Sequence, residues 1–278
     1  MNKLVYIMTL VVFTLLIVNA CHKKQDASID NKDKQSKSDI EAVNIDKNNV
    51  KDKVNDKDKT IEPPKADDTI GKVFFVSGNV DLNRNNEKKT LNKDDVLKEG
   101  DIIKTSTNGV AVLSLNDDKI KLEVQYNTEL ELNKLLGKDK SIKVDKGNVW
   151  TKVEKLNTGD KFSVNTPQTV AGVRGTIFYT FQAGDMWATC HCQGDVDYSD
   201  NGGKYHQEHH QDYLTFTKGD KTIVLTPEEM KKAFKTDTLQ HNHSVLPDSP
   251  LGPEAQKETQ EHAKIMSELI EKKFKELK

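Results

Sequence analysis

The chain has 278 residues, of which 31% are charged, and its 42 Lys and Arg against 44 Asp and Glu leave a formal net charge of −2. A chain so close to neutral offers no basic patch for a phosphate backbone, so a nucleic-acid partner is excluded from the expectations. The length allows one or two domains, once an exported leader and tail have been subtracted.

The first 20 residues have the features of a signal peptide. Lys3 supplies a positive charge, and residues 4–18 form an apolar run without charges. A helix that spans a membrane needs about 20 apolar residues, so this shorter run is typical of the apolar region of a signal peptide. Residues 1–20 are therefore predicted to be a leader.

The leader ends in Val18-Asn19-Ala20-Cys21, which resembles the lipobox of bacterial lipoproteins. The resemblance implies that Cys21 is lipidated and is the first mature residue. The protein is then expected in the bacterial cell envelope, periplasmic or surface-exposed, with its N-terminal lipid in the membrane. The alternative is an uncleaved membrane anchor that spans with tilt, and both interpretations place the remaining chain outside the cytoplasm.

Residues 21–68 are predicted to be a disordered, lipid-anchored linker. They are rich in Lys, Asp, Asn and Ser, with Pro63-Pro64 near the end, and contain almost no large apolar side chains. Such a segment cannot bury enough apolar surface to offset the entropy of ordering. A solvated helix held by paired charges is the alternative.

Short alternating strands begin at Thr69. Ile120, Leu122 and Val124 alternate with Lys119, Lys121 and Glu123, and successive side chains of a strand point to opposite faces. One face is thus expected in a core and the other in solvent. Gly, Asn and Asp turns separate the runs, which predicts a mainly β fold, a sandwich or roll, with eight or more strands between Thr69 and Phe181.

These runs carry a series of spaced motifs. They are Gly71-x-Val73, Gly78-x-Val80, Leu97-x-x-Gly100-Asp101-x-Ile103-x-Thr105, Gly109-x-Ala111-x-Leu113-x-Leu115, Gly147-x-Val149, Phe162-x-Val164-x-Thr166-Pro167 and Val170-Ala171-Gly172-Val173-Arg174-Gly175-Thr176-x-Phe178. The series resembles a FecR domain and extends from about residue 69 to about residue 198. We therefore expect a FecR-like β domain at residues 69–200.

The FecR resemblance implies a periplasmic β domain. In the sigma-regulator members this domain relays an outer-membrane signal through a transmembrane helix to a cytoplasmic partner. Here no cytoplasmic segment precedes the apolar run, and lipidation at Cys21 would replace that relay. A binding or scaffolding role toward an unidentified envelope protein or polymer is therefore favoured. The alternative is an envelope signal sensor or regulator of iron or metal uptake.

The most specific family motif is Gly172-Val173-Arg174-Gly175-Thr176. Its two glycines permit positive φ or close backbone approach, which favours a bend or bulge between strands. Arg174 must find hydrogen-bond acceptors if it is buried. A structural role is expected for the motif, and a ligand or partner contact through Arg174 is the alternative.

Cysteine and histidine gather after Thr189. If residues 186–196 form a strand, Cys190 and Cys192 share one face and His191 takes the other. Thiolates with imidazoles favour zinc or monovalent copper, so a site for a zinc, copper or iron ion is predicted. The candidate ligands are Cys190, Cys192, His206, His209, His210, His241 and His243.

Other interpretations of this cluster stay open. The cysteines could form a strained disulfide, be small buried side chains or have a redox role, and the histidines could be surface residues. The spacing matches no standard zinc finger. Neither H-E-x-x-H, its inverse, Gly-x-Ser-x-Gly nor a phosphate-binding loop is present, so the protein is not expected to be an enzyme.

Two helices are expected near the C-terminus. Thr226-Pro227-Glu228-Glu229 predicts a helix start in a His-rich extension, residues 201–252, with the helix ending near Lys235. An amphipathic helix is predicted within residues 253–278, beginning near Pro253. Its stripe is Ile265, Met266, Leu269, Ile270, Phe274 and Leu277, and at helical spacing it would dock on the β domain or on a partner helix.

Overall fold

The structure is a computed structural model that describes residues 69–277. The predicted signal peptide and linker, with Cys21, lie outside the described residues. Among residues 69–277, neither helix is long and apolar enough to cross a lipid bilayer.

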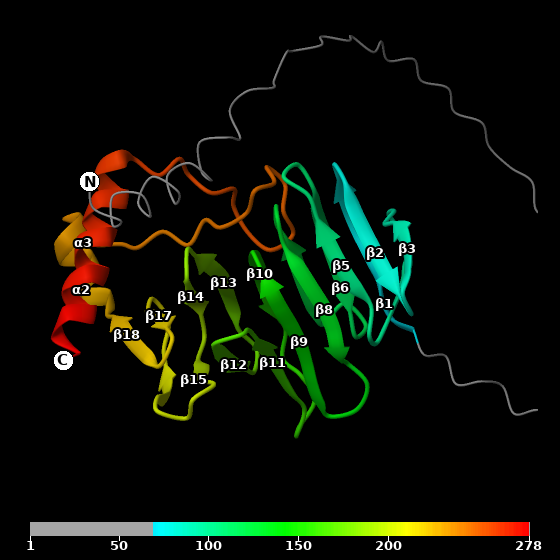
Figure 1. The fold of residues 1–278 in the computed structure, drawn as a ribbon, viewed down its shortest axis with the longest axis horizontal. Coiled ribbons are helices and arrows are strands. Elements are labelled where there is room, and N and C mark those ends of the chain that lie inside the picture. The colour runs from blue at the N-terminus through cyan, green and yellow to red at the C-terminus, as the bar shows by residue number, and fades with distance from the viewer. Residues whose placement is uncertain (1–68, 278) are drawn as a thin grey trace, which may run out of the picture. The chain divides into compact units, whose positions relative to one another are not determined.

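The described residues fold into two nine-stranded sheets, which confirms the mainly β prediction (Figure 1). Sheet A has the strand order β18-β17-β14-β13-β10-β7-β6-β1-β4, and sheet B has the order β16-β15-β12-β11-β9-β8-β5-β2-β3. The strands are β1 (Thr69–Ser77), β2 (Val80–Arg84), β3 (Glu87–Thr90), β4 (Val96–Lys98), β5 (Ile102–Thr105), β6 (Val110–Leu115), β7 (Ile120–Val124), β8 (Glu129–Lys134), β9 (Asp139–Lys146), β10 (Asn148–Val153), β11 (Lys161–Asn165), β12 (Thr169–Val173), β13 (Ile177–Ala183), β14 (Met186–Gln193), β15 (Val196–Asp200), β16 (His206–His209), β17 (Leu214–Lys218) and β18 (Lys221–Leu225).

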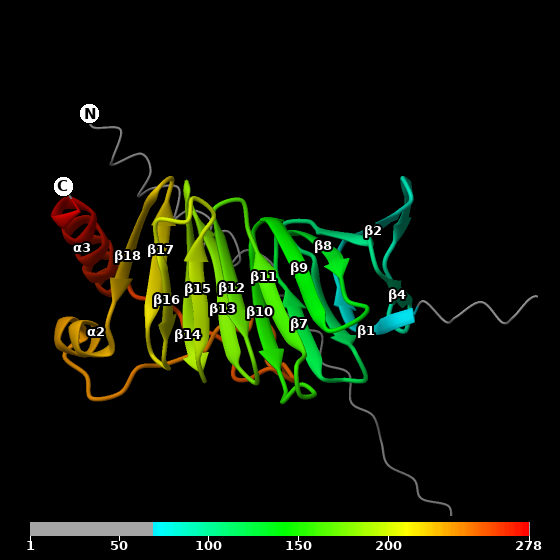
Figure 2. The same cartoon turned by 90° about the horizontal axis from the view of Figure 1, so that it is seen from below.

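From β6 onward, the chain alternates between the two sheets. β6 and β7 pair in sheet A, β8 and β9 in sheet B, and later pairs continue the alternation (Figure 2). The single strand β10 lies in sheet A between two excursions into sheet B, so β9 and β11 pair in parallel there. Each later strand or strand pair thus extends one sheet and then the other, so the domain is a two-sheet sandwich that lengthens in chain order.

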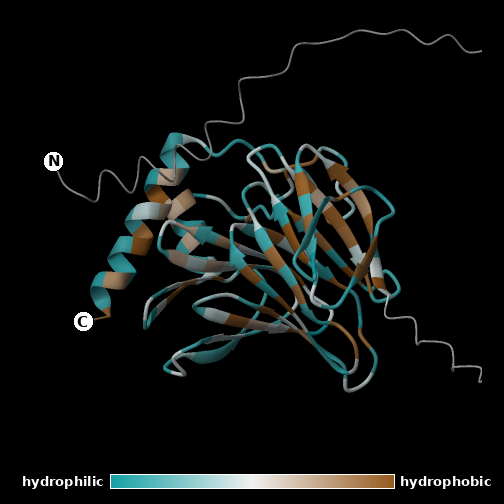
Figure 3. Ribbon diagram, turned by 45° about the vertical axis from the view of Figure 1, so that its right-hand side comes forward, coloured by the Kyte–Doolittle hydropathy of each residue, from teal (hydrophilic) through white to brown (hydrophobic). Residues whose placement is uncertain are grey.

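The main core lies between the sheets. Apolar and polar residues alternate along the strands (Figure 3), and the inward residues of both sheets form one buried cluster. Phe178 and Leu122 enter this cluster from sheet A, while Phe162 and Tyr198 enter it from sheet B. Burial of apolar side chains from facing sheets is the expected stabilisation of such a sandwich.

The middle of the outer face of sheet A is covered, which differs from the sequence-based expectation of a solvent-exposed face. Glu123 points outward from β7 and is nevertheless fully buried. The reason is a connecting segment, residues 236–258, which crosses this face between the two helices (Figure 1). We call this segment the strap. Its Leu246 and Leu251 pack with Trp150 in a small apolar cluster.

The helices are α2 (Pro227–Phe234) and α3 (Gln260–Glu276), and both lie beside β18 at one end of the sheets (Figure 2). Thr226 and Glu229 form the capping box that starts α2. α3 begins at Gln260 rather than near Pro253. Residues near 254 remain extended, because Ala255 N–H donates to the strap carbonyl of Ser244, and the Thr259 side chain then caps α3.

The apolar stripe of α3 docks on the β domain. Met266, Leu269, Ile270 and Phe274 pack with α2 and the outer face of sheet A near β17 and β18. Leu277, predicted to extend this stripe, is 41% exposed. Docking is therefore the structural role of this helix within residues 69–277.

Candidate metal centre

β14 places two cysteine side chains on the outer face of sheet A. Trp187 points into the main core, and residues two apart on a strand share a face, so His191 also points inward. Cys190 and Cys192 point the other way, toward the strap. Cys192 is buried and Cys190 is partly buried.

The strap brings two histidines to these cysteines. His241 and His243 each offer a ring nitrogen, and these atoms lie within 4.8 Å of one another and of both sulfur atoms. Four of the seven predicted ligands are thus brought together, two from β14 and two from the strap.

His241 is oriented by hydrogen bonds at both ring nitrogens. Its Nδ1 lies 3.4 Å from Cys190 Sγ, and its Nε2 lies 2.6 Å from Asp212 Oδ1. Histidine ligands of metals commonly donate the second ring N–H to a carboxylate, which fixes the ring and increases its basicity. Asp212 therefore occupies the position of such a supporting group.

His243 is held by aromatic packing. Its ring stacks on Tyr179 at a centroid separation of 4.6 Å and meets the edge of Trp150 at 5.7 Å. Its Nε2 is buried and has no hydrogen-bond partner among the described residues. A buried polar atom without a partner is costly, and a metal ion would satisfy this nitrogen.

The cluster favours a thiolate at Cys190. The Cys192 thiol donates to it and the imidazoles of His243 and His241 lie against it, so the pKa of Cys190 is held well below its usual value despite burial. Burial and the neighbouring Cys190 sulfur raise the pKa of Cys192. Burial alone would lower the pKa of His241, but Cys190 and Asp212 outweigh it and raise that pKa to about 9.

The donor set fits a tetrahedral transition-metal ion. Zinc lies about 2.3 Å from cysteine sulfur and about 2.0 Å from histidine nitrogen, so neighbouring ligand atoms of a tetrahedral site are about 3.3–3.8 Å apart. Since the four atoms all lie within 4.8 Å of one another, a tetrahedral site needs a contraction of at most about 1–1.5 Å between any two of them. Two thiolates and two imidazoles suit zinc or monovalent copper.

The three remaining candidate histidines lie elsewhere. His206 and His210 are exposed and pair with Asp197 at 2.6 Å and Asp195 at 2.7 Å. His209 is buried against Tyr205 and against the ring of His191. These histidines therefore do not join Cys190 and Cys192.

His210 also belongs to a second group of close ligand atoms, with Asp195 and Glu208. All three side chains are exposed, and His210 is already paired with Asp195. The pKa of His210 is raised by its hydrogen bond to Asp195 and by that negative charge. The pairing accounts for this group without an ion.

His191 points into the main core, unlike Cys190 and Cys192 on either side of it in β14. Both of its ring nitrogens are buried without a hydrogen-bond partner among the described residues. Burial lowers its pKa to about 4, so the ring is neutral in the interior at pH 7. Its separation from Cys190 and Cys192 follows the two-face prediction for this strand.

The family motif forms the turn between β12 of sheet B and β13 of sheet A. Gly175 has φ +74°, as expected for a bend, while Thr176 is buried and donates to the Asp195 carbonyl at 3.1 Å. Arg174 is exposed. The bend agrees with a structural role for the motif. The exposed Arg174 needs no buried acceptor, and its predicted alternative as a ligand or partner contact stays open.

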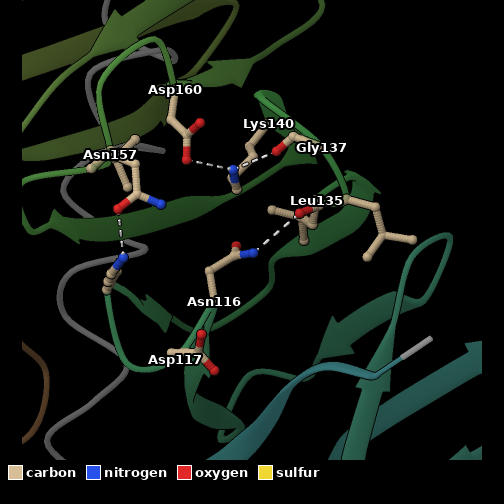
Figure 4. Close-up of a pocket in the computed structure, with 10 residues that line it drawn as sticks. Asn116, Asp117, Leu135, Gly137, Lys140, Asn157 and Asp160 are labelled. Atoms are coloured by element: carbon tan, nitrogen blue, oxygen red, sulfur yellow. Dashed lines mark hydrogen bonds and ion pairs between the residues drawn. The ribbon is translucent and has the colours of Figure 1, made fainter. Parts of the chain in front are cut away.

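A hollow is lined by the β6–β7, β8–β9 and β10–β11 connections (Figure 4), and none of the cysteine-cluster residues lines it. Lys140 lies beside it, paired with Asp160 at 3.1 Å and with the Gly137 carbonyl at 2.5 Å. Asn116 donates to the Leu135 carbonyl at 3.1 Å. The Lys140 ammonium and the Asn116 amide group therefore bond to neighbouring loops.

Two features of the site are not predictable from the sequence pattern. Asp212 lies beyond the histidine cluster in a turn, and only the pairing of β14 with β17 brings it near Cys190. Glu123 belongs to an alternating strand and is indistinguishable there from a solvent-exposed residue. Asp212 lies just before β17, so it could have been found only if the pairing of β17 with the cysteine strand β14 had been known.

The fold and this cluster define a two-sheet β protein with a candidate thiolate–imidazole metal centre. Residues 101–196 match the family model described as FecR protein. The chain therefore carries a FecR domain, as its motifs predict. The match includes Cys190 and Cys192 but ends before His241.

Two crystal structures are similar to part of the chain. They are structures of a "putative anti-sigma factor" from Parabacteroides distasonis ATCC 8503 at 2.50 and 1.65 Å resolution, each with 14% identity and a TM-score of 0.40. The matches cover 48% of this chain and 63% and 64% of those chains. The matched part is thus less than two thirds of either relative. No curated protein matches the chain.

Proposed function

We propose that this protein is a metal-binding FecR-domain module of the cell envelope. It binds one zinc or monovalent copper ion through Cys190, Cys192, His241 and His243. The observation that supports this proposal is the convergence of the four ligand atoms to within 4.8 Å. Asp212 and the unpartnered Nε2 of His243 support it further.

The proposed centre is structural or sensory, not catalytic. Four protein ligands complete a tetrahedral shell, whereas a catalytic zinc keeps one position for water or substrate. The site is also covered by the strap. We therefore propose that the protein is a binding or scaffolding module rather than an enzyme.

The proposed place of action is the envelope, with lipid attachment at Cys21. The support for it is the lipobox-like Val18-Asn19-Ala20-Cys21 and the apolar run before it. Metabolic labelling with a fatty-acid probe tests this proposal. Label on the wild-type chain and its loss in Cys21→Ala are the expected results, and label retained in the variant contradicts lipidation at this residue.

A second candidate function is that of a FecR-type regulator that senses an envelope signal and controls iron or metal uptake. The family match at residues 101–196 favours it. A deletion strain in which metal-uptake genes no longer respond to metal supply would support this function. An unchanged response would leave the binding or scaffolding role.

Elemental analysis of the purified full chain under reducing, metal-replete conditions tests the metal centre. About one zinc or copper per chain is expected, and the paired Cys190→Ser and Cys192→Ser variant should lose it. The matched control is a His206→Ala and His210→Ala pair, which alters exposed histidines away from the cluster and should retain the metal. Absence of stoichiometric metal, or its loss from the control alone, contradicts the proposal.

A further inference from the structure

The strap joins two apolar clusters across the outer face of sheet A. Before it, Phe234 of α2 and Phe274 of α3 both pack against the apolar cluster on β17 and β18. Farther along, Leu246 and Leu251 pack with Trp150. The candidate ligands His241 and His243 lie between these two anchoring regions, so an ion there would hold the middle of the strap.

The far half of the strap has its own polar anchor. Glu123 accepts hydrogen bonds from the Val245 amide at 2.9 Å and from the hydroxyls of Ser244 and Ser249 at 2.7 and 2.5 Å. Gln125 donates to the His243 carbonyl at 2.5 Å. The backbone next to one ligand is therefore fixed to the sheet without an ion.

The side chains at the middle of the strap contact the sheet differently. His241 lies between Asp212 and Cys190, and His243 stacks on Tyr179 while its Nε2 is buried without a hydrogen bond among the described residues. If the strap moves outward, His241 and His243 leave the cysteines, because the cysteines belong to β14 and the histidines do not. An open strap therefore cannot supply all four ligands.

We propose that the metal ion is a latch that keeps the strap closed over sheet A. This inference rests on the proposed metal-binding function. An ion bound by four ligands cross-links β14 to the strap, and loss of the ion leaves buried thiols and imidazoles that water solvates better. Since the open strap lacks the complete site, metal binding and strap closure are thermodynamically linked.

The latch controls what the FecR domain exposes. Trp150 is 2% exposed under the closed strap, and Gly252 lies directly against its ring. An open strap uncovers this tryptophan and the neighbouring Tyr179 on the outer face of sheet A. The strap remains attached through α2 and α3, so the change is a reversible local opening.

Hydrogen exchange of the full chain in buffers of defined free zinc tests the latch. The reporters are the amides of Val245, Leu246 and Ala255, which hydrogen-bond within the strap or to Glu123. If they exchange through the open strap, zinc at 100 times its Kd should slow them by about 100-fold. The Leu132 amide of β8, which donates to the Asp101 carbonyl in sheet B, is the reference and should respond less.

The outcomes separate the two proposals. Stoichiometric zinc with unchanged exchange of the strap amides overturns the latch and leaves the metal centre intact. Absence of zinc overturns the metal centre and the latch with it. Exchange slowed to the same extent in the strap and at Leu132 also overturns the latch, because it indicates stabilisation of the whole fold.

Two variants sharpen the test. Gly252→Ala should speed exchange of the strap amides with and without zinc, because a Cβ there would lie 2.6 Å from a Trp150 ring carbon. It touches no ligand, so zinc should still slow the exchange. Cys192→Ser should remove most of the zinc effect. A zinc effect of equal size in Cys192→Ser contradicts the latch.

Discussion

The buried carboxylate of Glu123 provides the most direct test of how the strap is held. It lies 0% exposed on the outer face of sheet A and accepts hydrogen bonds from Gln125, Ser244, Val245 and Ser249. Three of these four donors belong to the strap. We predict that Glu123→Ala strongly destabilises the protein and that Glu123→Gln does so only mildly.

The magnitude follows from the donors that lose their acceptor. After Glu123→Ala, Gln125 keeps a strap carbonyl at 2.5 Å and the Ser244 hydroxyl keeps another at 3.0 Å. The Val245 amide and the Ser249 hydroxyl are left without this acceptor. An unsatisfied buried group costs about 1–3 kcal/mol, and both of these bonds are only partly buried, so the expected loss lies in the lower part of about 2–6 kcal/mol in the free energy of unfolding.

The glutamine variant is the matched control. Its remaining oxygen still accepts from Val245, and its amide group can donate to the serine oxygens, so a loss of about 1 kcal/mol is expected. Urea unfolding followed by tryptophan fluorescence measures both values, with zinc content checked in each sample. If Glu123→Ala lies within about 0.5 kcal/mol of the wild type, the polar anchor does not hold the strap.

Three further predictions concern Gly252, Asp212 and Glu229. Gly252→Ala should cost about 1–3 kcal/mol in urea unfolding, because its Cβ would crowd Trp150; an unchanged midpoint contradicts this packing. Asp212→Asn should weaken zinc affinity about 10- to 100-fold in a competition titration, and unchanged affinity would show that Asp212 does not support the site. Burial raises the pKa of Glu229, but Lys273 and the capping box outweigh it and hold that pKa below its usual range. The stabilisation is therefore present above the unfolded pKa of about 4.3 and is lost as pH falls through the folded pKa, so the Tm difference between wild type and Glu229→Gln should shrink below about pH 4; a constant difference from pH 7 to pH 3 contradicts this.

Local sequence patterns predict the parts of the fold that local physics determines. The Thr226 capping box predicts the start of α2, and the alternation in residues 186–193 places the two cysteines on one face of β14. These features depend on residues within a few positions of each other. Side-chain periodicity and capping are therefore sufficient to derive them.

The coverage of sheet A depends on contacts between distant residues. Glu123 and its strap partner Ser249 are 126 positions apart, and the polar alternation in β7 is the same whether its outer face meets water or a strap. For the same reason, periodicity cannot tell that His241 and His243 are the histidines that reach the cysteines, or that Glu123 is buried. The packing of the strap on sheet A determines both.

The position of the cluster relates the FecR domain to the residues that follow it. Cys190 and Cys192 lie within the family match at 101–196, whereas His241 and His243 lie beyond it. A chain that ended after β15 would keep both cysteines on the outer face of sheet A but would lack the histidines, Asp212 and the strap that covers Glu123. The proposed metal site therefore requires the extension, and an ion bound there would stabilise the extension on the family domain.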